Sequence, residues 1–314
     1  MADSALSAPD STRVSSRPVS RPRVALPRRP KAPQFSDLRT LGVFERIEDK
    51  FFVSRQNLAS LEGLLQSRMR PSYLDPRTTF CGVESIYLDS ADLNSYTSHF
   101  QVEGAPAASH RFKVRLRRYF PDGRTDPTKT VLLELKSKIK EGEVSRTRKL
   151  RFSLGSRDYE QLMKGKTLKL VPRLLRLNEE IPTPELLDRF NTINGLIRKH
   201  ALKPVCKVSY VRRAFELPGL RVTFDDKIAY ETLARSKTRV MPAGSIQSEK
   251  QQLALRMAQS FKDFDGVVLE IKHGGEIPEW LTSFLAETKS PKMSFSKYCY
   301  SMTDRLFSPE GAIG

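Results

Sequence analysis

The segment at residues 110–120, HRFKVRLRRYF, constrains the fold more than any other part of the sequence. Successive side chains of a strand point to opposite faces of a sheet, so the segment predicts a strand whose apolar face carries Phe112, Val114 and Leu116. The opposite face carries Arg111, Lys113, Arg115 and Arg117. Like charges about 7 Å apart repel one another. The strand therefore predicts an anion on its basic side.

The same alternation recurs in at least four other segments. Their charged faces carry Arg46, Glu48 and Lys50; Glu134, Lys136 and Lys138; Arg221, Thr223 and Asp225; and Glu270 and Lys272. For any one strand, a face exposed to solvent explains the pattern equally well. Five such strands together, with long helices that need an apolar surface to pack on, predict a closed barrel with its charges inside. The predicted fold class is α+β, a closed and largely antiparallel β-barrel of about eight strands with flanking helices.

Turn residues and apolar periodicity outline the remaining elements. Two hairpins are predicted, with turns at Glu141-Gly142 and at Pro218-Gly219. Helices are predicted after the N-cap Ser54, over most of 156–200, over 245–260 and from Pro278. A strand is predicted over 266–274.

The charge of the chain points to a polyanionic partner. Lys and Arg number 54 against 36 Asp and Glu, which gives a net charge of +18. This balance suits nucleic acid, an anionic membrane or a phosphate-rich ligand. Part of it lies in residues 1–34, a stretch rich in Pro, Ser and Arg that predicts a disordered basic arm. The folded domain is predicted over 41–302, and a C-terminal tail over 303–314.

Other features exclude several classes of protein. The sequence has no run of 18 apolar residues and no apolar signal core, so it predicts neither a transmembrane segment nor secretion. Cys81, Cys206 and Cys299 are scattered, and the chain has only four His. This cysteine pattern argues against a zinc site or a disulfide framework and favours a cytoplasmic location.

The glutamates among the cations distinguish a phosphate chain from a nucleic acid. Carboxylates would repel a nucleic-acid backbone, and the residues between the cations are mostly Val, Leu and Ile instead of stacking aromatics. Carboxylates do suit Mg²⁺ or Mn²⁺, which bind one or two of them together with substrate phosphates. Glu48, Glu134 and Glu270 are the candidate metal ligands. Glu134 has an alternative interpretation, in which it only pairs with a neighbouring lysine.

Six short motifs occur in the order found in the vacuolar transporter chaperone (VTC) domain. They are an early Glu-x-Lys, Lys-x-Arg-x-Arg, a second Glu-x-Lys, YVRRAFELPGLRVTFD, VLEIK and a terminal FSKY. Over roughly residues 41–302 the chain resembles this family of triphosphate tunnel metalloenzymes. The resemblance implies an eight-stranded tunnel that makes inorganic polyphosphate from ATP with Mn²⁺ or Mg²⁺. Two positions depart from the pattern: Arg46 replaces a Glu of the wider superfamily, and Lys138 replaces a His of some polymerases.

The resemblance also implies roles for individual residues. The predicted catalytic residues are Lys50, Arg115, Arg117, Lys136, Arg212, Arg221, Lys272 and Lys297. The predicted substrate-binding residues are Lys113, Lys138, Arg146, Arg148 and Lys292. ATP and inorganic polyphosphate are the predicted partners. Two other functions stay open: hydrolysis of tripolyphosphate or a nucleoside triphosphate, and non-catalytic binding of polyphosphate or RNA, although nucleic acid is disfavoured.

Overall fold

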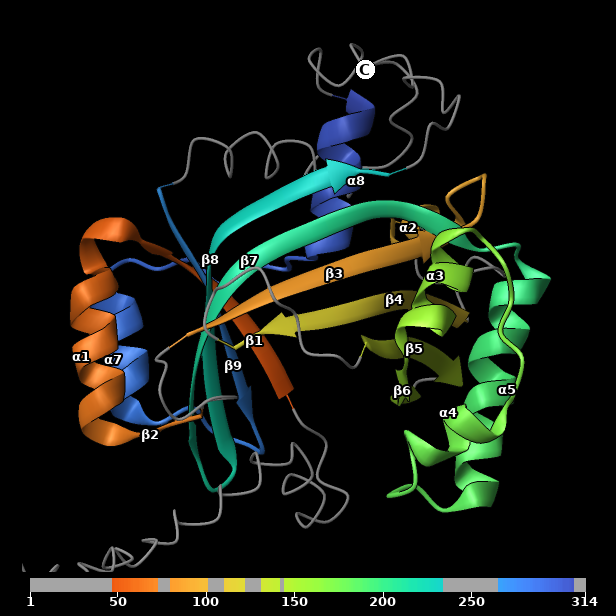
Figure 1. Cartoon of the computed structure of the whole chain (residues 1–314). Helices are drawn as coiled ribbons and strands as arrows, with labels where there is room; N and C mark the ends of the chain where they lie inside the picture. Colours follow the sequence, from red (N-terminus) through yellow and green to blue (C-terminus); the bar gives the residue numbers. More distant parts are fainter. Residues whose placement is uncertain are drawn as a thin grey trace, which may run out of the picture. The chain divides into compact units, whose positions relative to one another are not determined.

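One antiparallel sheet carries the charged strands (Figure 1). Within the described residues, eight long strands follow one another in the order β1-β9-β8-β7-β3-β4-β5-β6, and the short strand β2 pairs with β7. The strands are β1 (Ile47–Ser54), β2 (Arg70–Pro71), β3 (Cys81–Asp89), β4 (His110–Phe120), β5 (Val131–Glu141), β6 (Val144–Leu154), β7 (Lys203–Leu217), β8 (Leu220–Thr232) and β9 (Gly266–His273). The predicted α+β class with an antiparallel sheet is confirmed.

The structure is a computed structural model that describes residues 47–72, 80–100, 110–121, 131–141, 144–233 and 265–307. The predicted basic arm over 1–34 and the predicted helix over 245–260 lie outside these ranges. In the described part of the chain, no helix combines the length and the apolar character that crossing a membrane requires.

Both predicted hairpins are present. β5 and β6 pair continuously up to Glu141 and Val144, and β7 and β8 pair up to Leu217 and Leu220. Gly219, in the turn between β7 and β8, has φ +75°. This left-handed conformation is unfavourable for residues that carry a Cβ, which explains why the turn contains Gly.

Two groups of helices cover the apolar face of the sheet (Figure 1). α1 (Leu58–Arg68) and α7 (Glu279–Glu287) pack on β1, β8 and β9, where Leu61, Leu65 and Leu281 are fully buried. α3 (Ser156–Met163), α4 (Pro172–Arg176) and α5 (Thr183–Lys199) pack on β4, β5 and β6. Two of these helices begin slightly later than predicted. A 3₁₀ turn (Arg55–Asn57) separates Ser54 from α1, and Pro278 precedes the first residue of α7.

α8 (Lys297–Phe307) lies on the opposite face of the sheet, together with α2 (Asn94–Phe100). The ring of Tyr298 stacks on Tyr87 of β3 with centroids 4.8 Å apart, and its hydroxyl donates to the buried carboxylate of Asp89. No helix is predicted for this segment from the sequence. Residues 303–307 of the predicted tail belong to α8.

Side chains from opposite ends of the strand order meet, so the sheet is strongly curled. β1 is the first strand in the order and β5 the seventh, and in a flat sheet they would lie about 29 Å apart. Yet Lys136 Nζ on β5 lies 3.8 Å from Glu48 Oε2 on β1. The charged faces of the two halves of the sheet therefore look toward each other.

The predicted barrel closure is not confirmed, because the sheet is not closed by hydrogen bonds between β1 and β6. Residues 291–293 occupy the outer edge of β1 through two backbone hydrogen bonds of 3.1 and 2.7 Å. On the edge of β6, Asn178 and Arg189 bond to the backbone with their side chains. Since both edges already have partners at these positions, the two strands have no need to pair with each other there.

Candidate active site

Strand alternation gathers the charged side chains on the face opposite α1, α3, α4, α5 and α7, which we call the inner face. Its basic residues on the sheet are Lys50, Arg111, Lys113, Arg115, Arg117, Lys136, Lys138, Lys149, Arg151, Arg212, Arg221 and Lys272, and Lys297 joins them from α8. All eight residues predicted to be catalytic therefore lie on this face. Lys149 and Arg151 were missed, although their alternation with Leu150 and Phe152 was visible in the sequence.

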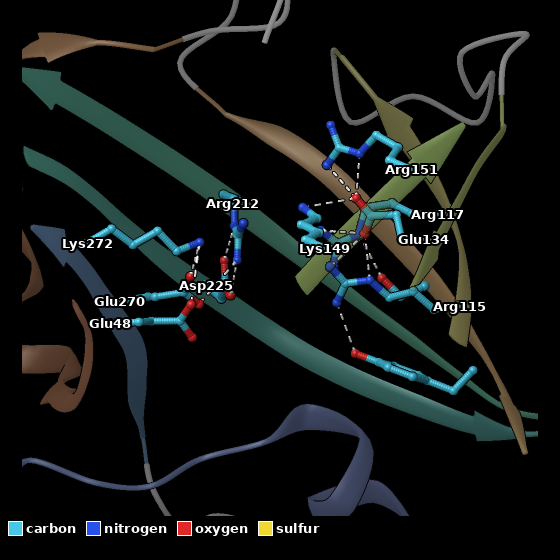
Figure 2. A network of polar contacts seen from close by, with 12 residues as sticks. Glu48, Arg115, Arg117, Glu134, Lys149, Arg151, Arg212, Asp225, Glu270 and Lys272 are labelled. Carbon is cyan, nitrogen blue, oxygen red and sulfur yellow. Dashed lines mark hydrogen bonds and ion pairs between the residues drawn. The ribbon is translucent and has the colours of Figure 1, made fainter. Parts of the chain in front are cut away.

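Glu134 lies at the centre of one group of these cations, the Glu134 cluster, which consists of Glu134, Arg115, Arg117, Lys149 and Arg151 (Figure 2). Arg115 Nε donates to Oε2 at 2.7 Å, and Arg117 approaches the same oxygen at 3.8 Å. Arg151 Nε donates to Oε1 at 2.7 Å, and Lys149 Nζ lies 3.2 Å from it. Both carboxylate oxygens are thus occupied by cations.

The pKa of Glu134 follows from these contacts. Burial alone would raise it, since only 2% of the side chain is exposed. The surrounding cations outweigh burial and hold the pKa well below its usual range. Glu134 is therefore ionised at neutral pH and holds the cluster together.

A second group, the Glu270 cluster, consists of Glu48, Lys50, Glu270 and Lys272 on the adjacent strands β1 and β9. Figure 2 labels Glu48, Glu270 and Lys272. Lys272 Nζ lies 2.6 Å from Glu270 Oε1 and 3.7 Å from Glu48 Oε2, so one lysine is shared by two carboxylates. Lys50 Nζ lies 2.9 Å from the other oxygen of Glu48. Among the described residues, the ion pair of Glu270 Oε2 is a longer one, 4.0 Å from Arg212.

Both carboxylates of the Glu270 cluster are ionised. Burial raises the pKa of Glu270, but Lys272, Arg212 and Lys50 together bring it well below its usual range. Burial and the neighbouring Glu270 both raise the pKa of Glu48, and the nearby lysines more than offset them. Two ionised carboxylates thus lie side by side among cations.

Asp225 connects the sheet to α8. Its carboxylate is fully buried and accepts two hydrogen bonds from Arg212, at 2.6 and 2.8 Å. Lys297 Nζ, at the start of α8, lies 2.5 Å from Asp225 Oδ2. Sequence reasoning placed Asp225 on the charged face but gave it no role, because nothing in the sequence shows that α8 reaches this strand.

The predicted substrate-binding residues fall in different places. Lys113 Nζ is on the inner face and donates to Ser296 Oγ at 2.9 Å, and Lys138 is exposed on the same face. Arg148 alternates out of this face and pairs with Asp188 of α5 at 2.6 Å. Lys292 is 64% exposed and pairs with Asp49, whose position on β1 alternates with Glu48 and Lys50. The side chain of Arg146 lies outside the described part of the structure.

The three predicted metal ligands do not form one site. No group of three or more His, Cys, Asp or Glu within the described ranges could hold a metal ion. Glu134 lies in its own cluster, with both oxygens taken. Glu48 and Glu270 do fit a hard divalent cation, because Mg²⁺ and Mn²⁺ commonly take one or two carboxylates and complete their shell with phosphate oxygens.

The basic side chains of the inner face repel one another in the absence of a ligand. Lys149 is about half exposed, yet loss of hydration on the curled face and the neighbouring Arg151 lower its pKa to about 7, against the effect of Glu134. Burial, with Lys50 and Lys272, lowers the pKa of Lys136 as well. A bound polyanion would relieve this repulsion.

Comparison with known families agrees with this geometry. The VTC domain family matches residues 45–304, so the chain belongs to that family and the resemblance is confirmed. The family match covers every inner-face residue named above.

Among solved structures, a proposed adenylate cyclase from Vibrio parahaemolyticus is 9% identical, covering 82% of this chain and 97% of its own, with a TM-score of 0.38. A conserved hypothetical protein from Pyrococcus furiosus is 11% identical over 77% of this chain and 87% of its own, with a TM-score of 0.31. A protein from Pyrococcus horikoshii OT3 is 13% identical, covering 85% of this chain and 93% of its own, with a TM-score of 0.30. Structural similarities of this size carry no argument about function.

Proposed function

We propose that the protein is a metal-dependent polyphosphate polymerase, which transfers the γ-phosphate of ATP to a growing inorganic polyphosphate chain. The observation that carries the proposal is the Glu270 cluster, in which two ionised carboxylates share one lysine on a face rich in cations. Membership of the VTC domain family supports the same substrate class.

The inner face matches the needs of phosphoryl transfer, in which catalysis is mainly positioning and neutralisation of charge. Arginines present several donors in a fixed plane and suit phosphate oxygens, and Arg115, Arg212 and Arg221 supply them from three different strands. Lys50, Lys272 and Lys297 add compact point charges. A chain of phosphates crossing this face would meet cations along its length.

In the proposed reaction, a terminal oxygen of the polyphosphate chain attacks the γ-phosphorus of ATP. The bond between that phosphorus and the β,γ-bridging oxygen breaks, and ADP leaves with the bonding electrons. Glu48 and Glu270 would hold the divalent cation, which when bound offsets charge on the phosphates. The nearby arginines and lysines align the two substrates and offset the charge that develops on the leaving oxygen.

The aromatic residues of the inner face argue against nucleic acid as the substrate. Tyr87, Tyr210 and Tyr298 are buried, at 6%, 4% and 1% exposure, and Tyr87 and Tyr298 stack on each other. Single-stranded nucleic acids are held largely by bases stacking on exposed aromatic rings. These rings are already used in packing α8 against the sheet.

The direct test is synthesis of polyphosphate. Purified protein with ATP and Mn²⁺ is expected to produce a ladder of chains on a gel, and EDTA is expected to abolish it. Glu270→Gln keeps the shape of the side chain but removes its charge, so turnover should fall on the order of 10²-fold or more.

Arg148→Ala provides the matched control, because it removes a cation from a surface pair with Asp188 outside the inner face. It should leave the ladder unchanged. Phosphate release without chains would favour the hydrolase alternative, and RNA binding without turnover of any triphosphate would favour the binding module. Full turnover by Glu270→Gln at saturating metal would remove the Glu270 cluster from the mechanism.

A further inference from the structure

Thr223 has a buried hydroxyl that finds no hydrogen-bond partner among the described residues. Its side chain is on β8, the residue is 3% exposed, and Oγ1 is shielded from solvent. Leaving a buried hydroxyl unsatisfied costs about 1–3 kcal/mol, whereas a valine of the same shape would avoid this cost. An unpaired hydroxyl at such a position therefore calls for an explanation.

The position of Thr223 in the sheet offers an explanation for its unpaired hydroxyl. Thr223 lies directly opposite Glu270 in the pairing of β8 with β9, and it shares the inner face with Arg221 and Asp225 on its own strand. Side chains directly opposite each other in an antiparallel pair have their Cβ atoms about 4.5–5.5 Å apart. On its other side, β7 places Ala214 opposite Thr223, and that side chain has no polar atom. The hydroxyl thus lies at the base of the Glu270 cluster.

None of the described side chains bonds to the Thr223 hydroxyl. Asp225 pairs with Arg212 and Lys297, and Glu270 pairs with Lys272 through Oε1. A phosphate group is bulky, and the hydroxyl lies below the charged ends of the flanking side chains. A single ion is small enough to reach it, and hydroxyl oxygens of Ser or Thr ligate Mg²⁺ in other phosphate-transfer sites.

We propose that Thr223 Oγ1 supplies a third protein oxygen, beside the carboxylates of Glu48 and Glu270, to a divalent cation that enters with the phosphate substrate. The inference rests on the metal dependence in the proposed function. It adds a neutral ligand from β8 to the acidic ligands of β1 and β9, so that three neighbouring strands hold the ion.

Thr223→Val tests the assignment, because it removes the hydroxyl and keeps the shape. The readout is the rise in melting temperature caused by tripolyphosphate, measured with EDTA and with Mn²⁺, together with the electron paramagnetic resonance signal of free Mn²⁺. We expect Thr223→Val to bind Mn²⁺ about 10-fold more weakly in the presence of tripolyphosphate, a loss typical of a removed metal-site partner. The rise measured in EDTA should stay at the wild-type value.

Two further variants control the experiment. Thr223→Ser restores the hydroxyl and should restore Mn²⁺ affinity, and it keeps the test usable if the valine variant folds poorly. Ser95→Ala removes another buried hydroxyl that has no partner within the described residues, and it lies in α2. It should leave Mn²⁺ binding unchanged, which separates the effect of location from the effect of losing any unpaired hydroxyl.

The possible outcomes are distinct. Wild-type Mn²⁺ affinity in Thr223→Val would overturn the assignment. A loss of tripolyphosphate binding in EDTA as well would assign the hydroxyl to phosphate instead, which also overturns it. Because these measurements need no synthesis, a missing polyphosphate ladder would contradict the proposed polymerase while leaving the Thr223 result to be judged separately.

Discussion

The two carboxylate clusters of the inner face are built from the same residue types but behave differently. In the Glu134 cluster, one carboxylate meets four cations, and each of its oxygens is shared by two of them. In the Glu270 cluster, two carboxylates share Lys272, and the ion pair of Glu270 Oε2 with Arg212 is long, at 4.0 Å. Glu48 also contacts Lys50 and Lys136, so about two cations serve each carboxylate there, against four for Glu134. This difference in the ratio of cations to carboxylates predicts a structural role for Glu134 and agrees with the proposed metal site at Glu48 and Glu270.

The largest expected effect comes from removing the charge that holds the Glu134 cluster. Glu134→Gln should lower the free energy of unfolding by about 3 kcal/mol, at the low end for a broken buried pair because three of the four cations are partly exposed. For a domain of this size, the melting temperature should fall by about 6–12 °C. Tripolyphosphate should recover much of this loss, because the freed cations can bind it.

Glu84→Gln is the matched control for that experiment. Glu84 alternates out of the inner face on β3, and its ion pair within the described residues is with Arg118. Its loss should cost about 1 kcal/mol or less, and tripolyphosphate should not recover it. Equal destabilisation by the two variants would contradict the structural role of the Glu134 cluster.

Lowering the pH should weaken the contribution of both clusters to the stability of the folded protein. Glu134 and Glu270 have pKa values below the usual range in the folded protein, despite burial, because of the cations around them. A depressed folded pKa stabilises the protein above the unfolded pKa of about 4.3, and this stabilisation is lost as pH falls through the folded pKa. Melting temperature should therefore fall as the pH is lowered below about 4.5. The melting temperature of Glu134→Gln should fall less steeply with decreasing pH than that of the wild type. The same fall in both proteins would contradict the conclusion that Glu134 is ionised in the folded protein.

The smallest expected effect is the uptake of a proton by the Glu134 cluster when tripolyphosphate binds. Loss of hydration and the cationic neighbours lower the pKa of Lys149 to about 7, although about half of the side chain is exposed. A bound polyanion would therefore favour its protonated form. Tripolyphosphate binding to the wild type should weaken between pH 7 and 9, by at most about 10-fold per pH unit from this group. Titration calorimetry in buffers of different ionisation enthalpy measures the proton taken up.

Lys149→Met should remove that proton uptake and flatten the dependence on pH. Lys50→Met should weaken binding but leave the slope intact, because Glu270 and Glu48 raise the pKa of Lys50 in spite of its burial and keep it charged. If Lys149→Met keeps the wild-type slope, the titrating group is not Lys149.

Much of the inner face could be predicted from the sequence because strand alternation is a local property. The pattern around Arg115 and Arg117 placed both on one face, and the same reasoning placed Glu48, Glu134 and Glu270. Alternation does not show which strands become neighbours. It therefore grouped Glu134 with Glu48 and Glu270 as metal ligands, whereas the strand order separates them into two clusters.

The sequence by itself determined the antiparallel sheet, its hairpins, its basic inner face and its family, because each depends on periods of two residues, on turn residues or on ordered motifs. Only the tertiary structure decided how the sheet ends, since 291–293 reach the edge of β1 from more than 200 residues away. It also decided that α8 brings Lys297 to Asp225, and that Thr223 lies opposite Glu270 with no hydrogen-bond partner in the described part of the chain. Contacts of this kind join distant segments, and their register depends on packing across the whole sheet and not on the residues of any one strand.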